Sequence, residues 1–235
     1  MNRRKVLIYF AAPLALVLPM VFMYFSGVDT LQRIISPRIE GLYGNSNREL
    51  GLLESAQNVV LLVVIALMIR GIFIHRTWWI RAGSAAAFCV VSFLFLEEID
   101  DGLHYKEYFT GGAAEDAAEV RNWHNVGDRT NRMKQILDVS VVFWFLVVPF
   151  AAQGSAYPIV RAGVPDKYAA LTLVAMVITR SLAHGLQDAG FGDPGTMDSN
   201  LSEFRELVMY YLGMVYMFDV SERRLRGLPG LGEAT

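Results

Sequence analysis

Residues 6–26 read VLIYFAAPLALVLPMVFMYFS, and the basic residues Arg3, Arg4 and Lys5 stand directly before them. An α-helix needs about 20 apolar residues to cross the hydrocarbon core of a bilayer. The run is longer than the apolar part of a signal peptide, which has about 7–15 residues, and no small-x-small cleavage site follows it. We therefore expect a retained signal-anchor helix, which makes the chain a membrane protein.

The composition of the whole chain supports this class. Of its 235 residues, 54% are hydrophobic and 19% are charged, whereas a soluble domain carries about 25% charged residues. The net charge of −2 excludes a nucleic-acid-binding protein, which would carry a basic excess. The single cysteine, Cys89, excludes a disulfide-stapled secreted protein. Its position inside an apolar run favours a small buried side chain.

Five further apolar segments follow the first one. They span residues 52–74, 82–99, 136–157, 168–186 and 204–220, and the last three are weaker because each carries polar residues near one end. The sequence therefore predicts an all-α fold, a polytopic membrane bundle of about six transmembrane helices in one domain over residues 1–226. The tail, residues 227–235, is rich in glycine and proline and is expected to be loose.

The distribution of charge predicts how the bundle lies in the membrane. With six spans both termini share one side, and most basic residues outside the spans fall on that side while most acidic residues fall on the other. Because Lys and Arg concentrate in cytoplasmic loops, we expect both termini in the cytoplasm. The outer segments are then residues 27–51, 100–135 and 187–203. The first of them has apolar residues at helical spacing, which predicts an amphipathic helix on the membrane surface.

The end of the third segment carries the strongest candidate site. Glu97, Asp101 and His104 stand at i, i+4 and i+7, so a continuing helix places them on one face. Asp101 and His104 also form an acid-x-x-His pair, a spacing that offers two ligands to a metal from one helical turn. A solvated helix end also explains Glu97 and Glu98. However, four acids within five residues at the negative end of a helix require a compensating cation or arginine.

The start of the fourth segment carries a second polar stripe. His124, Asp128 and Asp138 share one helical face with Asn131 and Gln135. An amphipathic helix outside the bilayer explains the first part of this stripe. Asp138 stands directly before an apolar run, and a charge that faces lipid there costs at least about 2.5 kcal/mol. We therefore expect Asp138 to face the bundle interior.

The fifth and sixth segments add polar groups on the same outer side. Arg180 and His184 share a face near the end of the fifth segment. We expect Arg180 to pair with an embedded acid such as Asp138 or with an anion, or else to snorkel to the interface. The positive N-terminus of the sixth helix explains Glu203. Glu206 and the tyrosine four residues after it are candidates to line an inner cavity.

Carboxylates and histidines together are typical ligands of zinc, iron or manganese. We therefore predict a divalent metal site on the outer side, with nearby side chains that move protons. The predicted metal ligands are Glu97, Asp101, His104, His124 and Asp128. The predicted catalytic residues are Glu98, Asp138 and His184, and the further site residues are Arg180, Asn125 and Glu206.

Two short motifs carry a resemblance to other proteins. Residues 97–102, Glu-Glu-Ile-x-x-Gly, and residues 122–125, Asn-Trp-His-Asn, resemble motifs of a group of uncharacterised bacterial polytopic membrane proteins. That group has Glu-Glu-Ile-Ser-Trp-Gly-Gln and Asn-Leu-His-Asn, whereas Asp100-Asp101 here replace Ser-Trp and Leu103 replaces Gln. The resemblance implies a bacterial cytoplasmic membrane protein whose outer side is periplasmic. It implies no activity, and its candidate residues are Glu97, Glu98, Gly102, Asn122, His124 and Asn125.

Three functions fit these observations. The first is a metal-dependent membrane enzyme that acts on a lipid or lipid-linked substrate at the outer leaflet. The alternative is a non-catalytic accessory or assembly subunit of a larger membrane complex, in which the polar cluster is structural. The third, a proton-coupled transporter, is weaker because the sequence has no inverted repeat or pair of broken helices. The expected partners are membrane lipids and other membrane subunits.

Overall fold

The computed structural model describes residues 2–39, 50–75, 78–99, 102–110, 135–136, 138–152, 163–192 and 201–225. These residues form helices and no strand. In chain order the helices are α1 (Arg3–Val6), η1 (Leu7–Ala11), α2 (Ala12–Tyr24), α3 (Asp29–Ile35), α5 (Leu52–Ile74), α6 (Trp78–Glu98), α7 (Leu103–Thr110), η4 (Phe143–Val147), α9 (Val148–Ala151), α11 (Ala169–Asp188) and α12 (Ser202–Leu225).

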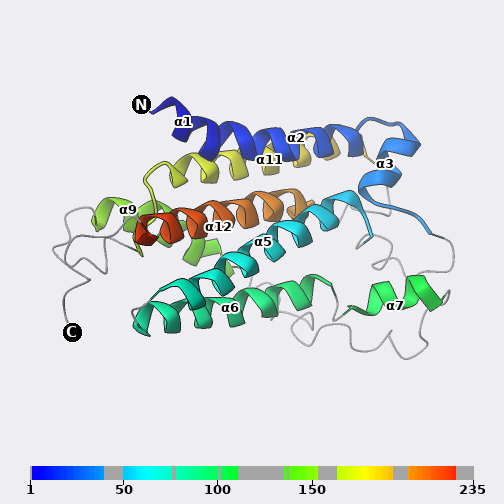
Figure 1. The fold of residues 1–235 in the computed structure, drawn as a ribbon. Helices are drawn as coiled ribbons and strands as arrows, with labels where there is room; N and C mark the ends of the chain where they lie inside the picture. Colours follow the sequence, from blue (N-terminus) through cyan, green and yellow to red (C-terminus); the bar gives the residue numbers. More distant parts are fainter. Residues whose placement is uncertain are drawn as a thin grey trace.

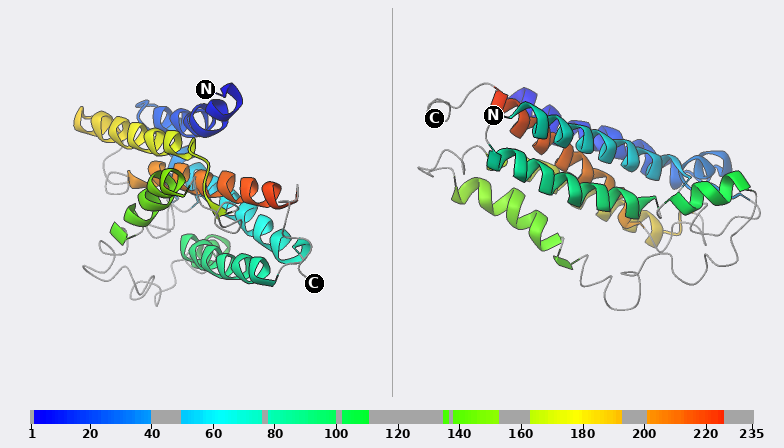
Figure 2. Two further views of the ribbon diagram at one scale, coloured as in Figure 1. Left: turned by 90° about the vertical axis from the view of Figure 1, so that its left-hand side faces the viewer. Right: turned by 60° about the horizontal axis from the view of Figure 1, so that its bottom comes forward.

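The long helices lie side by side and successive ones run in opposite directions (Figure 1, Figure 2). The expectation of an all-helical chain is therefore confirmed for the described residues. Three of their helices are long and apolar enough to cross a membrane, namely Arg3–Tyr24, Leu52–Ile74 and Ala169–Asp188. Arg81–Leu96 and Asp138–Ala151 are shorter apolar helices. A membrane location is consistent with these lengths.

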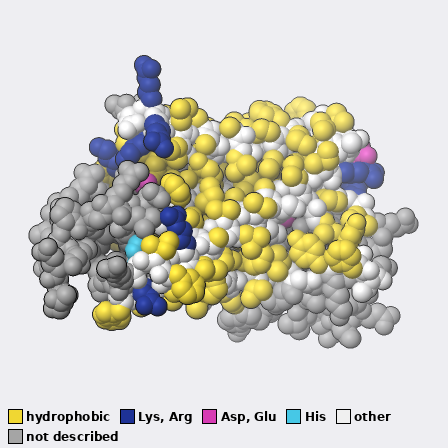
Figure 3. Space-filling model, viewed as in Figure 1, with side chains coloured by type: hydrophobic (Ala, Val, Ile, Leu, Met, Phe, Trp, Pro, Cys, Tyr) yellow, Lys and Arg dark blue, Asp and Glu magenta, His cyan; other side chains and the backbone are white. Residues whose placement is uncertain are grey.

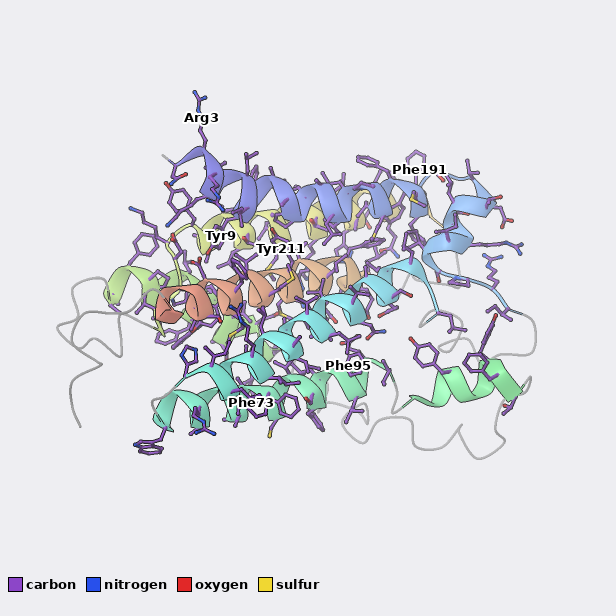
Figure 4. The ribbon with its side chains drawn as sticks, viewed as in Figure 1. Arg3, Tyr9, Phe73, Phe95, Phe191 and Tyr211 are labelled. Atoms are coloured by element: carbon purple, nitrogen blue, oxygen red, sulfur yellow. The ribbon has the colours of Figure 1, made fainter. Side chains whose placement is uncertain are left out.

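Near Pro13, backbone carbonyls of the N-terminal helix accept hydrogen bonds from neighbouring helices. Pro13 has no N–H, so it cannot donate to the carbonyl of Tyr9 four residues earlier. The hydroxyl of Thr172 on α11 donates to that carbonyl at 2.5 Å. In the π turn η1 the N–H of Ala12 bonds to Leu7, which leaves the carbonyl of Ile8 to accept from the hydroxyl of Tyr211 at 2.8 Å. Tyr211 on α12 therefore points toward the N-terminal helix (Figure 4).

The main core lies around α12, the sixth predicted segment. Phe204, Leu207 and Val208 of this helix are fully buried and pack in one cluster with side chains of α2, α5 and α11. Figure 1 shows α12 between α5 and α11. The polar residues that make this segment a weak sequence signal therefore lie on a helix that packs against α2, α5 and α11.

The outer surface is largely apolar along the middle of the bundle. Exposed examples are Phe73, Val90, Val139 and Val177. Figure 3 shows hydrophobic side chains over the middle of one face, most of the lysines and arginines at the end that holds α1, and a smaller basic group beside an acid at the other end. This pattern suits a belt of lipid with a basic interface at one end. Cys89 is exposed on α6, so the expectation that it is buried is wrong; an apolar surface in lipid accommodates it equally well.

Within the predicted outer segment 27–51, the expected amphipathic helix corresponds to α3. Ile35 of α3 is fully buried and belongs to the main core, whereas Ile34 is exposed. α3 therefore folds back against the bundle through one face instead of lying only on the membrane surface. Gly27, with φ of 71°, makes the turn between α2 and α3, a conformation that glycine adopts at little cost.

Candidate metal centre

Three glutamates from three helices meet at one end of the bundle. Glu54 of α5, Glu98 of α6 and Glu203 of α12 each place a carboxylate oxygen within 4.8 Å of the other two. Glu54 is 2% exposed and Glu203 is 6% exposed, while Glu98 is half-buried. We call these three residues the glutamate cluster, and their carboxylates can hold a metal ion.

The helix ends explain why these residues converge. Glu54 lies in the first turn of α5 and Glu203 in the first turn of α12, while Glu98 is the last residue of α6. Because α6 runs opposite to α5 and α12, these three ends lie together, at the end of the bundle opposite α1 (Figure 1). Phe95, one turn before Glu98, lies toward this end in Figure 4, and Arg3 lies at the other.

Two helix N-termini stabilise part of the negative charge. The first turn of a helix carries a partial positive charge, which favours an ionised Glu54 and an ionised Glu203. Glu98 stands at the opposite, negative end of its helix and needs other support. The hydroxyl of Tyr210 on α12 donates to Oε1 of Glu98 at 2.5 Å and supplies it.

Gln57 connects α5 to the carboxylate on α12. This side chain is fully buried, and its Nε2 donates to the backbone carbonyl of Glu203 at 2.9 Å and to Oε2 of Glu203 at 3.3 Å. Its Oε1 has no hydrogen-bond partner. Asn58, which is 6% exposed, has no hydrogen-bond partner for either Oδ1 or Nδ2.

The charges of the glutamate cluster repel one another strongly. Two unit charges 4.8 Å apart cost about 3.5 kcal/mol at an effective dielectric constant of about 20. Three ionised carboxylates at this separation therefore destabilise one another, and a bound cation or protons on the carboxyl groups would relieve that repulsion.

Of the predicted catalytic residues, Glu98 is the one that belongs to this cluster. Asp138 accepts from Nη1 of Arg205 at 2.9 Å, so of the alternatives expected for Arg180, pairing with Asp138 is not the one observed. Arg180 and His184 are both exposed on α11. Arg205 lies on α12, so this hydrogen bond joins two parts of the chain that are close in space but distant in sequence.

Glu206, a further predicted residue, lies one turn along α12 from Glu203. It is close enough to Tyr210 to interact with it electrostatically, as are Glu98 and Glu203. That Glu206 and Tyr210 line an inner cavity stays a prediction.

The histidine-containing part of the predicted site lies outside the described residues. This applies to Asp101, His124, Asn125 and Asp128 and to the side chains of Glu97 and His104. Within the described part of the chain, the group that can hold a metal consists of glutamates alone. The predicted histidine ligands stay a prediction.

Sequence reasoning missed Glu54, Gln57 and Asn58. All three interrupt the first turns of the 52–74 segment, and their spacing of i, i+3 and i+4 places them on one helical face. A polar side chain that faces lipid is costly, so these three residues, like Asp138, are expected to face the bundle interior, and the signal was present. The favourable charge at its helix N-terminus explained Glu203 locally, so nothing in the sequence indicated its long-range contacts.

The chain matches no protein-family model, no curated protein and no solved structure. The resemblance to bacterial membrane proteins with the Glu-Glu-Ile-x-x-Gly motif stays a prediction.

Proposed function

We propose that this protein is a metal-dependent enzyme of the bacterial cytoplasmic membrane that acts on a lipid or lipid-linked substrate. In this proposal six helices span the membrane, both termini are cytoplasmic, and the glutamate cluster lies on the periplasmic side. The observation that carries the proposal is the convergence of Glu54, Glu98 and Glu203 inside a helical bundle. A bilayer-embedded group of charges is expensive, and such groups are retained mainly for function.

The position of the cluster supports a lipid substrate. Glu54 and Glu203 lie in the first turns of their helices, so the cluster lies near the end of the bundle and not at its middle. In a bilayer this depth corresponds to the boundary between headgroups and acyl chains. A substrate with an apolar tail and a polar headgroup can reach such a site from the membrane itself.

The residues of the cluster suit hydrolysis or transfer at a polar headgroup. A divalent ion bound there would polarise a headgroup oxygen or lower the pKa of a water molecule. The hydroxyl of Tyr210, held on Glu98, and the carboxylate of Glu206 are the groups next to it that can hold or move a proton. His184 and Asp138, which the sequence also suggested, take no part in this cluster.

The test combines metal analysis with lipid turnover. Full-length protein purified in mild detergent is analysed for metals by mass spectrometry and then placed in vesicles of total bacterial lipid, whose products are also analysed by mass spectrometry. We expect about one ion per chain, lipid conversion that stops with EDTA and resumes with added metal, and loss of both in Glu203→Gln. The control is Asp188→Asn at the exposed end of α11. Metal-loaded protein that converts no lipid contradicts the proposal, as does protein without metal.

Histidine ligands are tested in the same preparation. His104→Ala and His124→Ala lower the metal content if the predicted histidines complete the site. If both variants keep the ion while Glu203→Gln loses it, the glutamates hold the metal without them.

The second candidate is a non-catalytic subunit of a membrane complex. α6 packs mainly on α5 and exposes Val90 and Phe93, a face that a helix of a partner can cover. Purification in mild detergent tests it, because a stable co-purifying membrane protein supports this candidate and a monomer at every stage contradicts it.

A further inference from the structure

One face of α5 carries a short polar ladder inside an apolar helix. Glu54, Gln57 and Asn58 stand at i, i+3 and i+4, so their side chains project from the same side of the helix. All three are at least nine-tenths buried, at 2%, 0% and 6% exposed. The ladder faces α12, because Nε2 of Gln57 donates to the carboxylate of Glu203.

The two amides of this ladder have unused hydrogen-bonding atoms. Oε1 of Gln57, together with Oδ1 and Nδ2 of Asn58, has no partner. Because Nε2 and Oε1 belong to one small amide group, the hydrogen bond from Nε2 to Glu203 fixes Oε1 beside the glutamate cluster. A buried amide without a partner loses about 1–3 kcal/mol of hydrogen bonding. The two amide oxygens, Oε1 of Gln57 and Oδ1 of Asn58, therefore indicate an occupant that accepts their lone pairs.

We propose that the glutamate cluster binds a hard divalent cation of the Mg²⁺, Mn²⁺ or Ca²⁺ class, and that the amide oxygens of Gln57 and Asn58 complete an all-oxygen shell around it. This inference rests on the proposed function and names the ion that the site takes. It differs from the zinc or iron that histidine ligands would favour.

The spacing of the carboxylates fits an ion of this class. Two ligands on opposite sides of an ion lie at twice the metal–oxygen distance, which is about 4.0–4.2 Å for Mg²⁺ and about 4.6–5.2 Å for Ca²⁺. The three carboxylate oxygens lie within 4.8 Å of one another. They can therefore surround one ion with little movement of the helices.

The chemistry of the ligands selects the same class. Carboxylate and amide oxygens suit Mg²⁺, Ca²⁺ and Mn²⁺, whereas thiolate or imidazole ligands favour zinc and iron. In the described part of the chain the cluster offers only oxygen ligands. Three carboxylates exceed the charge of one divalent ion by one. The N–H of Gln57 and the hydroxyl of Tyr210, which donate to Glu203 and Glu98, offset part of that excess.

The test measures Mn²⁺ binding to the full-length protein. Protein in detergent is stripped with EDTA and titrated with Mn²⁺, and free Mn²⁺ is followed by electron paramagnetic resonance. We expect one bound ion that millimolar Mg²⁺ or Ca²⁺ displaces. Gln57→Leu and Asn58→Leu should each weaken Mn²⁺ binding by about 10- to 100-fold, the range typical of residues that support a metal site. Asn58→Asp, which keeps an oxygen at the same position, should bind at least as tightly as the wild type.

The matched control is Thr179→Val on α11. Thr179 is also fully buried and its hydroxyl also lacks a partner, but it stands outside the cluster, so Mn²⁺ binding should not change. Gel filtration and circular dichroism show whether each variant is folded, and Asn58→Asp keeps the test decisive if both leucine variants misfold. Mn²⁺ binding that is equal in wild type, Gln57→Leu and Asn58→Leu overturns the inference. So does a bound ion that neither Mg²⁺ nor Ca²⁺ displaces, or an Asn58→Asp variant that binds more weakly than the wild type.

The outcomes also separate this inference from the proposed function. If the amide variants bind normally but metal and lipid conversion depend on Glu203, the inference fails and the proposed function stands. If Mn²⁺ binds as expected but no lipid is converted, the cation site stands and the enzymatic proposal fails.

Discussion

Replacing Glu54 by glutamine should make the metal-free protein more stable, although Glu54 is almost completely buried. Gln has nearly the same volume as Glu, so Glu54→Gln removes a charge without opening a cavity. In the metal-free protein the carboxylate of Glu54 faces two others within 4.8 Å, and each ionised pair costs about 3.5 kcal/mol at a dielectric constant of about 20. Protonation relieves part of this cost, so we expect a net gain of about 2 kcal/mol.

This gain converts into a measurable melting temperature. For a chain of 150–250 residues, 1 kcal/mol shifts Tm by about 2–4 °C, so Glu54→Gln in EDTA should melt about 4–8 °C above the wild type. With a cation at one hundred times its Kd the wild type gains about 2.7 kcal/mol, or about 5–11 °C. We expect Glu54→Gln to raise the Kd for the cation about 100-fold. At the same cation concentration, binding then stabilises the variant by only about 0.4 kcal/mol, so its Tm should hardly change.

Thermal unfolding in detergent, followed by intrinsic fluorescence, is the assay. The wild type and Glu54→Gln are compared in EDTA and in millimolar Mn²⁺, and Asp188→Asn serves as a control that should change neither value. A variant that melts below the wild type in EDTA, yet keeps the full shift with Mn²⁺, refutes the reasoning. That result would mean that Glu54 does not share a cation site with Glu98 and Glu203.

Two further variants test the packing around the site. Asp138→Asn removes the ion-pair partner of Arg205, whose side chain is 14% exposed while that of Asp138 is 39% exposed. We expect the free energy of unfolding to fall by about 1–2 kcal/mol, less than the 3–5 kcal/mol of a fully buried pair. The double variant Asp138→Asn with Arg205→Met should regain stability in the same melting assay. Phe204→Ala leaves a cavity at a fully buried position of the core and should lower the free energy of unfolding by about 3–5 kcal/mol. Phe73→Ala, at a position that is 78% exposed, should change it by no more than about 0.5 kcal/mol. Equal losses from the two variants would contradict the assigned core.

The helices were largely predictable because their signal is local. An apolar run of about 20 residues defines a helix that crosses a bilayer without reference to any partner. The boundaries 52–74 coincide with α5, Leu52–Ile74, and helices also occupy the described parts of the other predicted segments. The predictions for 136–157, 168–186 and 204–220 were weaker, because each segment carries polar residues near one end. In α12, Arg205 and Tyr210 are such residues, and their side chains bond to Asp138 and Glu98 of other helices.

The site was predictable only in part because its contacts are long-range. Glu98 stood out through the unusual density of acids at its helix end. Glu203 did not stand out, because a helix N-terminus explains it locally. The pairing of Asp138 with Arg205 joins positions 67 residues apart, and helical periodicity cannot say which of several arginines comes nearest.

The sequence by itself determined that the chain is helical, where its apolar helices lie and that acids gather at the end of α6, because hydropathy and charge act one segment at a time. The tertiary structure alone decided which acids meet. It brought the start of α5, the end of α6 and the start of α12 together, and it joined Glu54, Glu98 and Glu203 within 4.8 Å. The physical reason is that packing depends on the shapes of facing helices, whereas periodicity fixes only the face of each helix that is turned inward.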